Sequence, residues 1–380
     1  MRDNNETAVD TAAHSPVLHA LLFGAAVLVI AVAAGIRSRH YEPKVDQAVL
    51  DGRMAHDFET QYDHQFPARS FGISLWAAID YALFHEAKSG VIIGKGGWLY
   101  TDEEFLVGNE SAQRVERNLA AIESVHEQLA AQGIKLVVAM VPAKARVYPE
   151  HLDGRQPPAL HQGLYGRAQS ALAADGIAHA DLLKPLADGK SDGPTFLRTD
   201  THWTVHGAQL AAQQIATVVR TQLPAPSAPT TFTTTTEPPK VHQGDLLNFL
   251  PLAPYFSWLL PPPETIVTAH TDGAGGGDLL GGSAAPRIAL VGTSYSANPN
   301  WNFDGALEQS LGEDVGNYAK DGQGPFAPMK AYLAGTDFKD APPQLVIWEI
   351  PERYLAVSAQ PKAADKAGAP QPPANGPAGL

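Results

Sequence analysis

The sequence contains no cysteine. A thiol nucleophile, a disulfide framework and a metal site built on thiolates are therefore excluded. If the chain carries out nucleophilic catalysis, the attacking group must be a serine, a threonine or another residue without sulfur. The absence of cysteine leaves the compartment open, because exported bacterial proteins without disulfides are common.

Positive charge is also scarce. The chain has 27 Lys and Arg residues against 40 Asp and Glu residues, which gives a formal net charge of −13. Proteins that bind nucleic acid carry a basic stripe that neutralises phosphates, and the sequence has none, so nucleic acid is excluded as a partner. A polyanionic substrate stays open, because a local group of cations can invert the field inside a cleft.

Hydrophobic residues make up 44% of the 380 residues, enough to bury a substantial core in one large domain or two modest ones. The longest apolar run extends from Pro16 to Ile36 and contains no charged residue. A helix of that length spans a bilayer core of about 30 Å. We therefore expect residues 16–36 to form an uncleaved transmembrane signal-anchor, after a cytoplasmic segment at residues 1–15.

Two alternatives to this anchor stay open. Ala31-Val32-Ala33 is a small-residue pattern typical of signal-peptide cleavage, and a buried core helix would also be apolar. The flanking charges give little support for an exported domain, since Arg37 and Arg39 follow the run. Residues 37–90 are expected to be a membrane-proximal connector.

Three segments have compositions typical of loops or linkers. Residues 224–240 are rich in Pro and Thr and suggest a linker or an extended edge segment, and residues 272–282 form a glycine-rich loop. Residues 358–380 are Ala, Pro, Gly and Lys with little to bury, which predicts a disordered tail.

Helical and strand-like segments alternate between these regions. Helices are predicted at residues 111–132, 163–175 and 204–223, and short apolar strands at residues 135–141, 177–180, 287–291 and 344–350. Such alternation predicts an α/β fold in which a mostly parallel sheet is covered by helices on both faces. In folds of this class the reactive groups gather at the carboxyl ends of the strands.

A serine follows one of these strands at once. Gly292-Thr293-Ser294-Tyr295-Ser296 comes after Val291, and a glycine before a serine permits a tight turn that exposes the hydroxyl beside backbone N–H groups. Ser294 is the candidate nucleophile and Ser296 its competitor. The pattern alone is weak, since most such serines lie in ordinary loops.

An acid and a histidine stand two residues apart far upstream, in Asp200-Thr201-His202. On an extended turn both side chains point to one side, so the carboxylate can orient the imidazole that accepts the serine proton. Asp200 as a capping residue and His202 as a structural histidine stay open. A metal site with His206 is disfavoured, because no third distant ligand is evident.

Further polar residues follow other strands. Lys144 and Arg146 come after the strand ending at Val141, and Glu349 and Arg353 lie in and after the last strand. Gly322, in an Asp-Gly-Gln-Gly-Pro loop, can offer an N–H group to an oxyanion. Our candidates for oxyanion or substrate binding are Gly322, Lys144, Tyr295 and Arg353. For Arg146, surface solvation is the simpler interpretation.

Six motifs in a fixed order resemble the alginate O-acetyltransferase family of SGNH-hydrolase-like proteins, the AlgJ- and AlgX-like proteins. They are Gly97-Trp-Leu-Tyr100, the stretch Pro142–Glu150, Asp200-Thr-His-Trp-Thr204 with Gly207-Ala208, Gly244-Asp-Leu246, Gly292-Thr-Ser-Tyr-Ser296 and Trp348-Glu-Ile-Pro-Glu-Arg353. The resemblance covers residues 94–354. With an N-terminal anchor and no evident C-terminal carbohydrate-binding domain, the chain is more similar to the membrane-anchored AlgJ type.

The resemblance implies a three-layer α/β/α sandwich over residues 91–357, in which the Asp–His pair precedes the Ser. It implies Ser294 as nucleophile, His202 as base and Asp200 as orienting acid, with no cofactor and no metal. It also implies a periplasmic domain held at the bacterial inner membrane, a polysaccharide acceptor and a multi-pass membrane O-acyltransferase as the partner that delivers acetyl groups.

The sequence departs from ordinary SGNH enzymes in two places. Gly-Thr-Ser and Asp-x-His replace Gly-Asp-Ser and Asp-x-x-His, a change that the resembled family shares. No asparagine matches the usual oxyanion donor, since Trp348-Glu349 stands near its place. The expected activity is O-acetylation of an exported polysaccharide. An acetyl-esterase and a non-catalytic polysaccharide-binding scaffold are the alternatives.

Overall fold

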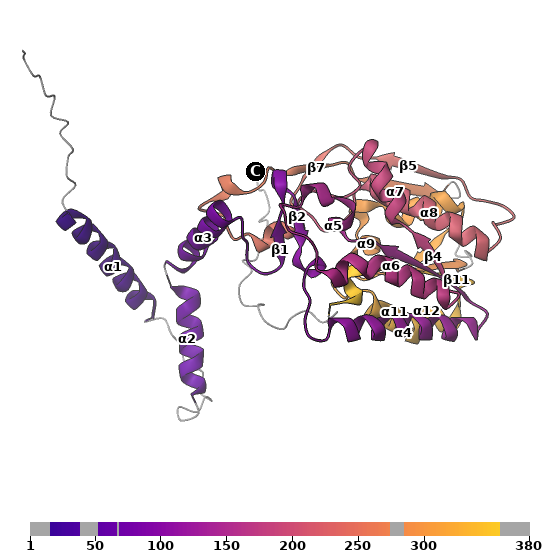
Figure 1. Cartoon of the computed structure of the whole chain (residues 1–380), viewed down its shortest axis with the longest axis horizontal. Helices are drawn as coiled ribbons and strands as arrows, with labels where there is room; N and C mark the ends of the chain where they lie inside the picture. The colour runs from indigo at the N-terminus through magenta and orange to yellow at the C-terminus, as the bar shows by residue number, and fades with distance from the viewer. Residues whose placement is uncertain (1–15, 39–51, 67, 274–284, 358–380) are drawn as a thin grey trace, which may run out of the picture. The chain divides into compact units, whose positions relative to one another are not determined.

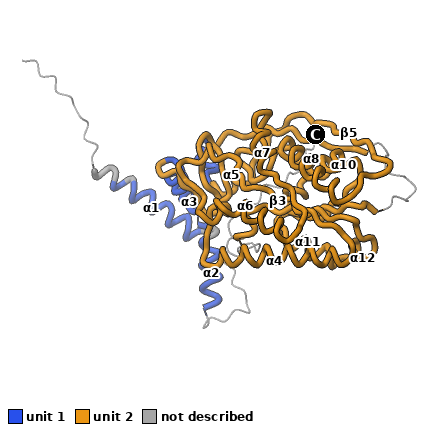
Figure 2. Tube along the Cα trace, turned by 45° about the vertical axis from the view of Figure 1, so that its right-hand side comes forward, with its two compact units in different colours: residues 1–82, 251–259 blue, residues 83–250, 260–380 orange. Residues whose placement is uncertain are grey.

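The structure is a computed structural model that describes residues 16–38, 52–66, 68–273 and 285–357. The expected cytoplasmic segment, the expected tail and most of the glycine-rich loop lie outside these residues. Contacts divide the chain into two compact units, coloured separately in Figure 2. Unit 1 is Met1–Ala82 with Pro251–Leu259, and unit 2 is Leu83–Leu250 with Leu260–Leu380.

Unit 1 is helical. Its helices are α1 (Pro16–Ser38), α2 (Arg53–Gln65) and α3 (Arg69–Ile79), and a short π-helix, η1 (Asp80–Phe84), begins at its C-terminal end. Within the unit, residues 251–259 pack on α3, where the ring of Tyr255 meets Phe71 edge to face with ring centroids 5.3 Å apart. Over the part of the chain that the structure covers, no helix is both long and apolar enough to cross a membrane.

A parallel five-stranded sheet forms the centre of unit 2. Its strands, in spatial order, are β10 (Val315–Asn317), β9 (Ile288–Val291), β11 (Leu345–Pro351), β3 (Lys135–Val141) and β4 (Ala178–Asp181). All four pairings are parallel. The α/β fold with a mostly parallel sheet is therefore confirmed.

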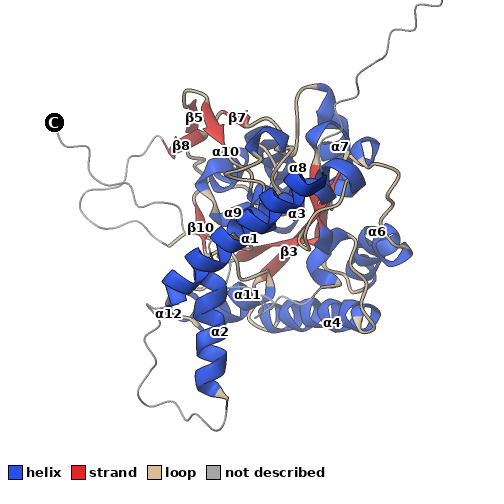
Figure 3. Cartoon of the chain, turned by 90° about the vertical axis from the view of Figure 1, so that its left-hand side faces the viewer, coloured by secondary structure: helices blue, strands red, loops and turns tan. Residues whose placement is uncertain are grey.

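Helices cover both faces of this sheet. One face carries α7 (Leu183–Asp188), α8 (Val205–Gln222) and α10 (Phe303–Leu311), and the other carries α4 (Ser111–Ala130), α6 (Ala159–Ala174), α11 (Phe326–Ala334) and α12 (Thr336–Asp340). Figure 1 shows α7 and α8 on one side of the sheet and α4, α11 and α12 on the other. In Figure 3, β3 runs between α8 and the pair α4 and α11.

Strand alternation explains why the strands are continuously apolar. Along β3, Val137 and Ala139 belong to the core under α8, while Val138 and Met140 belong to the core under α4 and α6. Because both faces are covered, every residue of the strand except its first is buried. Complete burial of each aliphatic side chain contributes about 1.5–3 kcal/mol to folding.

Three antiparallel pairs and several short helices complete unit 2. The pairs are β1 (Val91–Ile93) with β2 (Leu99–Thr101), β5 (Phe232–Thr236) with β8 (Ala269–Gly273), and β6 (Lys240–His242) with β7 (Glu264–Ile266). The short helices that position the site are α5 (Lys144–Val147), α9 (Ser294–Ala297), η6 (Asp245–Phe249), η8 (Pro299–Trp301) and η9 (Glu352–Leu355). The expected linker at residues 224–240 thus contains β5 and the first residue of β6, and the β-branched threonines of β5 favour extended backbone.

Candidate active site

Ser294 begins α9, directly after the turn that ends β9. The turn is fixed by Glu349 of the neighbouring strand β11, which is fully buried. Its carboxylate accepts hydrogen bonds from the backbone N–H of Thr293 (2.7 Å) and from the Thr293 hydroxyl (3.0 Å). Ser296 also donates to Glu349 (3.0 Å), so this competitor for the nucleophile role is already engaged inside the protein.

Gly292 is required by the same contact. A Cβ atom on this residue would lie 2.5 Å from the Glu349 Oε2 atom and 2.8 Å from its Cβ atom. Because Glu349 belongs to a fully buried strand, it has no room to withdraw. The glycine therefore permits the close approach of the carboxylate to the nucleophile turn.

Asp200 and His202 lie on a turn between two buried aromatic residues. Phe196 and Trp203 form an antiparallel bridge that closes the turn. The next residue, Thr204, is the N-cap of α8, and its hydroxyl oxygen accepts a hydrogen bond from the backbone N–H of Gly207. A cap of this kind contributes about 1 kcal/mol, and here it fixes the point where the turn enters the helix.

Carboxylates from two other elements hold the outside of this turn. Glu264 of β7 accepts hydrogen bonds from the N–H groups of Arg198 and Thr199, both at 2.7 Å. Asp245 of η6 accepts one from the N–H of Thr201 at 2.8 Å. Charge-assisted bonds to backbone amides are strong, so the backbone that carries Asp200 and His202 is held in one conformation.

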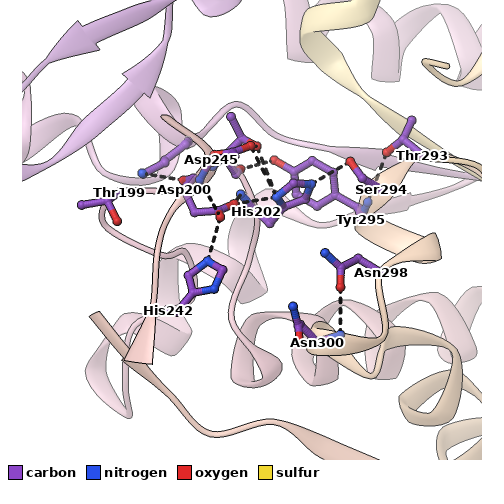
Figure 4. A network of polar contacts seen from close by, with 12 residues as sticks. Thr199, Asp200, His202, His242, Asp245, Thr293, Ser294, Tyr295, Asn298 and Asn300 are labelled. Atoms are coloured by element: carbon purple, nitrogen blue, oxygen red, sulfur yellow. Dashed lines mark hydrogen bonds and ion pairs between the residues drawn. The ribbon is translucent and has the colours of Figure 1, made fainter. Parts of the chain in front are cut away.

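The side chains of Ser294, His202 and Asp200 are in contact, as Figure 4 shows. The distance from His202 Nε2 to Ser294 Oγ is 2.7 Å, and that from His202 Nδ1 to Asp200 Oδ1 is 2.6 Å. The backbone N–H of His202 also donates to Asp200 Oδ1, at 3.0 Å. When Nδ1 carries the proton that Asp200 accepts, Nε2 is free to take the proton of the serine hydroxyl.

The electrostatics suit this arrangement. Burial opposes ionisation of Asp200, but the hydrogen bonds from His202 and His242 outweigh it and hold the pKa of Asp200 well below its usual range. Asp200 is therefore a carboxylate at any ordinary pH. A fixed negative charge next to Nδ1 stabilises the imidazolium that forms when His202 accepts a proton.

Tyr295 and Arg353, both candidates for substrate binding, lie behind the site. Both are buried, and the hydroxyl of Tyr295 donates to the carbonyl oxygen of Thr201. Arg353 Nε donates to Glu103 at 2.9 Å, and its Nη1 approaches the Tyr295 hydroxyl at 3.4 Å. These contacts tie the turn of His202 to η9, so we correct our expectation and assign both residues a supporting role.

Lys144 also differs from our expectation of a substrate-binding cation. Its side chain is 1% exposed, and its ammonium donates to the carbonyl oxygens of Leu99 (2.6 Å), Arg198 (2.9 Å) and Asp200 (2.9 Å). Burial lowers the pKa of Lys144 to about 8, which leaves it charged at neutral pH. The sequence predicts a cation at the end of this strand, and Lys144 is there. However, its long aliphatic side chain places the ammonium inside the protein, where it stabilises the inner side of the Asp200 turn.

Gly322 is exposed and lies in the loop after β10, with a positive φ of 71°. The loop runs beside the nucleophile turn, because the N–H of Lys320 donates to the carbonyl oxygen of Gly292 at 3.1 Å. Asn298 is the C-cap of α9, the short helix that Ser294 begins, and its Oδ1 accepts the N–H of Asn300 at 3.0 Å. In Figure 4 the amide nitrogen of Asn298 is turned away from Asn300, toward the side of Ser294 and His202.

The potential metal ligands at the site have other partners. One atom each of Asp200, His202 and Asp245 lie within 4.8 Å of one another. However, His202 Nδ1 is hydrogen-bonded to Asp200, and Asp245 accepts hydrogen bonds from both the N–H and the hydroxyl of Thr201. His206 is directed to the carbonyl oxygen of Gly189 at 3.1 Å. We interpret the cluster as the network that orients His202.

Sequence reasoning overlooked two residues that contact this network. His242 Nε2 lies 2.9 Å from Asp200 Oδ2, and the Trp301 ring stacks on His202 with ring centroids 5.3 Å apart. Neither residue stands in a pattern that identifies it. The nearest sequence motif is Gly244-Asp245, which begins two residues after His242. The structure explains its glycine, because a Cβ on Gly244 would lie 2.1 Å from the carbonyl oxygen of Thr199.

Comparisons with known proteins point to one family. Residues 91–352 match the family described as "SGNH hydrolase-like domain, acetyltransferase AlgX". The chain is 49% identical over 321 residues to a Pseudomonas fluorescens protein named probable alginate O-acetylase AlgJ, covering 84% of this chain and 82% of the relative. It is 47% identical over 328 residues to the protein of the same name from Pseudomonas aeruginosa, covering 84% of each.

A solved structure agrees with these relatives. The chain is similar to the O-acetyltransferase domain of Pseudomonas putida AlgJ, with a TM-score of 0.66 and 45% sequence identity over 70% of this chain and 92% of that one. The fold, the family match and the relatives therefore all indicate the same family. The chain belongs to the AlgX family of SGNH hydrolase-like acetyltransferase domains, together with the AlgJ proteins.

Proposed function

We propose that this chain is an O-acetyltransferase that moves an acetyl group through an acetyl ester on Ser294 to hydroxyls of an alginate-like polysaccharide. One observation carries the proposal: His202 bridges Ser294 and Asp200 through hydrogen bonds of 2.7 and 2.6 Å. Nucleophile, base and orienting acid of an acyl-transfer enzyme stand in that relation. The relatives named alginate O-acetylase support the acetyl group and the class of acceptor.

The reaction has two halves. In the first, His202 Nε2 takes the hydroxyl proton of Ser294 as Oγ attacks the carbonyl carbon of the acetyl donor. The donor's leaving group departs with that proton, and the acetyl group stays on Oγ as an ester. In the second half, His202 takes the proton of a sugar hydroxyl, whose oxygen attacks the ester. Ser294 leaves and regains the proton, and the sugar carries the acetyl group.

Negative charge develops on the carbonyl oxygen in both halves. We propose the backbone N–H of Ser294 as one donor to this oxyanion, because the first amides of a helix have no acceptor within it. We propose the amide nitrogen of Asn298 as a second donor, since the hydrogen bond from Asn300 to its Oδ1 fixes how the amide is turned. Gly322 remains a further candidate.

The location of the enzyme is part of the proposal. We propose that residues 16–36 anchor the chain in the bacterial inner membrane, with residues 1–15 in the cytoplasm and a catalytic domain at residues 91–357 in the periplasm. The uncharged run from Pro16 to Ile36 supports the anchor. A multi-pass membrane O-acyltransferase would then supply the acetyl group. Membrane fractions from cells test the anchor: alkaline carbonate should leave the chain bound and detergent should release it.

Transfer to sugar is tested with the purified full-length chain, an activated acetyl ester and alginate oligosaccharides. The proposal predicts oligosaccharides heavier by one or more acetyl groups, detected by mass spectrometry, with the wild type and none with Ser294→Ala. Acetate without acetylated sugar would instead favour an acetyl-esterase. A chain that binds the oligosaccharide and forms no acetyl ester would favour a scaffold.

A further inference from the structure

The carboxylate of Asp200 has a second histidine partner, which the two halves of the reaction do not use. His242 ends β6, and its side chain is 15% exposed. Its Nε2 atom lies 2.9 Å from Asp200 Oδ2, on the opposite side of the carboxylate from His202 (Figure 4). Since Asp200 is ionised, His242 must carry a proton on Nε2 and donate it to this oxygen.

Both oxygens of Asp200 are thereby fully engaged. Oδ1 accepts from the ring and the backbone N–H of His202, and Oδ2 accepts from His242 and from the backbone N–H of Asp245 at 3.1 Å. With donors at both oxygens, the carboxylate cannot rotate about its bond to Cβ without losing a charge-assisted hydrogen bond. The direction in which Oδ1 faces His202 is therefore set in part by His242.

One aromatic side chain contacts both histidines. Trp301 is buried, its ring lies nearly parallel to that of His202, and His242 meets it edge to face with centroids 5.8 Å apart. The β6–β7 pairing also fixes the backbone position of His242, because His242 stands opposite Glu264 in the register. Glu264 in turn accepts the N–H groups of the Asp200 turn. His242 is therefore held by the same elements that hold the turn.

We propose that His242 is a positioning residue for acetyl transfer, which holds Oδ2 of Asp200 so that Oδ1 keeps His202 directed at Ser294. This rests on the proposed function, in which His202 is the base. His242 touches neither the nucleophile nor the acetyl group and acts only through Asp200.

The charges around His242 favour its protonated form. The groups that act on it are Asp200 on the turn, Glu264 on β7 and Asp245 on η6, while η8 contributes the uncharged Trp301. The hydrogen bond to Asp200 and these negative charges outweigh burial and raise the pKa of His242. When His242 is protonated, its hydrogen bond to Oδ2 of Asp200 is charge-assisted and therefore stronger.

The test measures the burst of p-nitrophenol when the full-length chain is acetylated by p-nitrophenyl acetate, from pH 5 to 9. His242→Phe removes the donor and the charge, and His242→Gln keeps a donor near the Nε2 position without the charge. Replacing a hydrogen-bond partner that orients a metal-ligating histidine typically costs 10–100-fold, and we take the same range for the partner that orients the Asp200–His202 pair. We expect His242→Phe to slow acetylation about 10–100-fold, and His242→Gln to recover most of that rate.

His270→Gln is the matched control. His270 makes the same kind of contact, Nε2 to Asp272 Oδ1 at 3.0 Å, but both side chains are 71% exposed. It should match the wild type in rate and pH profile. A His242→Phe variant whose rate falls only in step with its melting temperature, and whose rate His242→Gln does not recover, would overturn the positioning role.

A second measurement does not depend on acetylation. The proton between His202 Nδ1 and Asp200, in a hydrogen bond of 2.6 Å, should give a low-field proton NMR signal that disappears in His202→Gln. The signal should shift in His242→Phe and stay in place in His270→Gln. If the wild type forms no acetyl ester, the proposed function fails while the NMR signal still decides the positioning role. A signal unchanged in His242→Phe would overturn that role.

Discussion

The carboxylate of Glu349 accepts hydrogen bonds from both the backbone N–H and the hydroxyl of Thr293, the residue immediately before Ser294. Strand alternation gives Glu349 this position: it follows Trp348, which pairs with Val291 in the sheet register, and so lies beside the turn after β9. Burial raises the pKa of Glu349, and its three donor partners oppose that rise. A buried acid in the central strand thus fixes the position of the nucleophile.

Replacing Glu349 tests this relationship. Glu349→Ala leaves the buried N–H of Thr293 unpaired, which should cost about 1–3 kcal/mol of unfolding free energy. It should also slow acetylation of Ser294, because the turn is released. Glu349→Gln retains one carbonyl oxygen for Thr293 and should lose less of both. Urea unfolding and the p-nitrophenol burst measure the two effects, and equal losses in the two variants would contradict the assignment.

Gly244 tests the role of the η6 segment in holding the Asp200 turn. In Gly244→Ala the new Cβ would lie 2.1 Å from the backbone oxygen of Thr199, so the turn or the segment must move. A displacement of about 1 Å at a catalytic group can reduce the rate about 100-fold. We expect a loss of that order in the acetylation rate. Gly166→Ala in α6 is the control, since its Cβ would meet nothing within 4 Å, and it should keep the wild-type rate.

Asn298 tests the proposed oxyanion donors. Loss of one such donor typically lowers kcat about 10²–10³-fold. Asn298→Ala and Asn298→Asp should both show a loss of this size, since the aspartate keeps an oxygen for the N–H of Asn300 but lacks the amide donor. Single-turnover acetylation and urea unfolding, measured together, separate a rate effect from instability. A wild-type rate in Asn298→Ala would remove Asn298 from the site.

Glu352 predicts how stability depends on pH. Burial raises its pKa from the ordinary value of 4.5 to about 7, despite Arg146 at 3.1 Å. The folded chain therefore holds this proton more tightly than the unfolded chain, and stability falls as pH rises from about 4.5 to about 7. A shift of this size corresponds to about 3 kcal/mol.

The measurement for Glu352 is urea unfolding across that pH range. Glu352→Gln cannot ionise, so its stability should decline less between pH 4.5 and 7 than that of the wild type. Glu123→Gln, a change at an exposed residue of α4, should follow the wild type. A Glu352→Gln variant with the same slope as the wild type would contradict the shift.

The sequence was sufficient to predict the sheet and its helices where the patterns are long. The strand at residues 135–141 has the predicted bounds, and Thr204 caps the predicted helix. β10 was overlooked because it has three residues, one of them glycine, and forms only by pairing with β9. The β6–β7 pair was overlooked for a similar reason: a proline-rich stretch gives no sign that its short strands pair across the chain.

At the site, too, residues next to long local patterns could be predicted, and residues placed by pairing across the chain could not. Asp200, His202 and Ser294 stand next to predicted strands or helices, so sequence position could bring them together, and the structure places them in contact. His242 could not be found in this way, because its contact with Asp200 depends on the β6–β7 pairing. The direction of the Lys144 side chain could not be predicted from sequence either, because the three carbonyl oxygens that bind its ammonium come together only in the folded protein.

The decisive experiment locates the acetyl group on the protein. The full-length chain is mixed with an activated acetyl ester, quenched in acid within seconds, digested and mapped by mass spectrometry. Acyl transfer through Ser294 predicts an acetyl group on Ser294 in the wild type and in Ser296→Ala, and none on that peptide in Ser294→Ala or His202→Ala. An acetyl group that persists in His202→Ala, or that appears on another residue when Ser294 is intact, would contradict it.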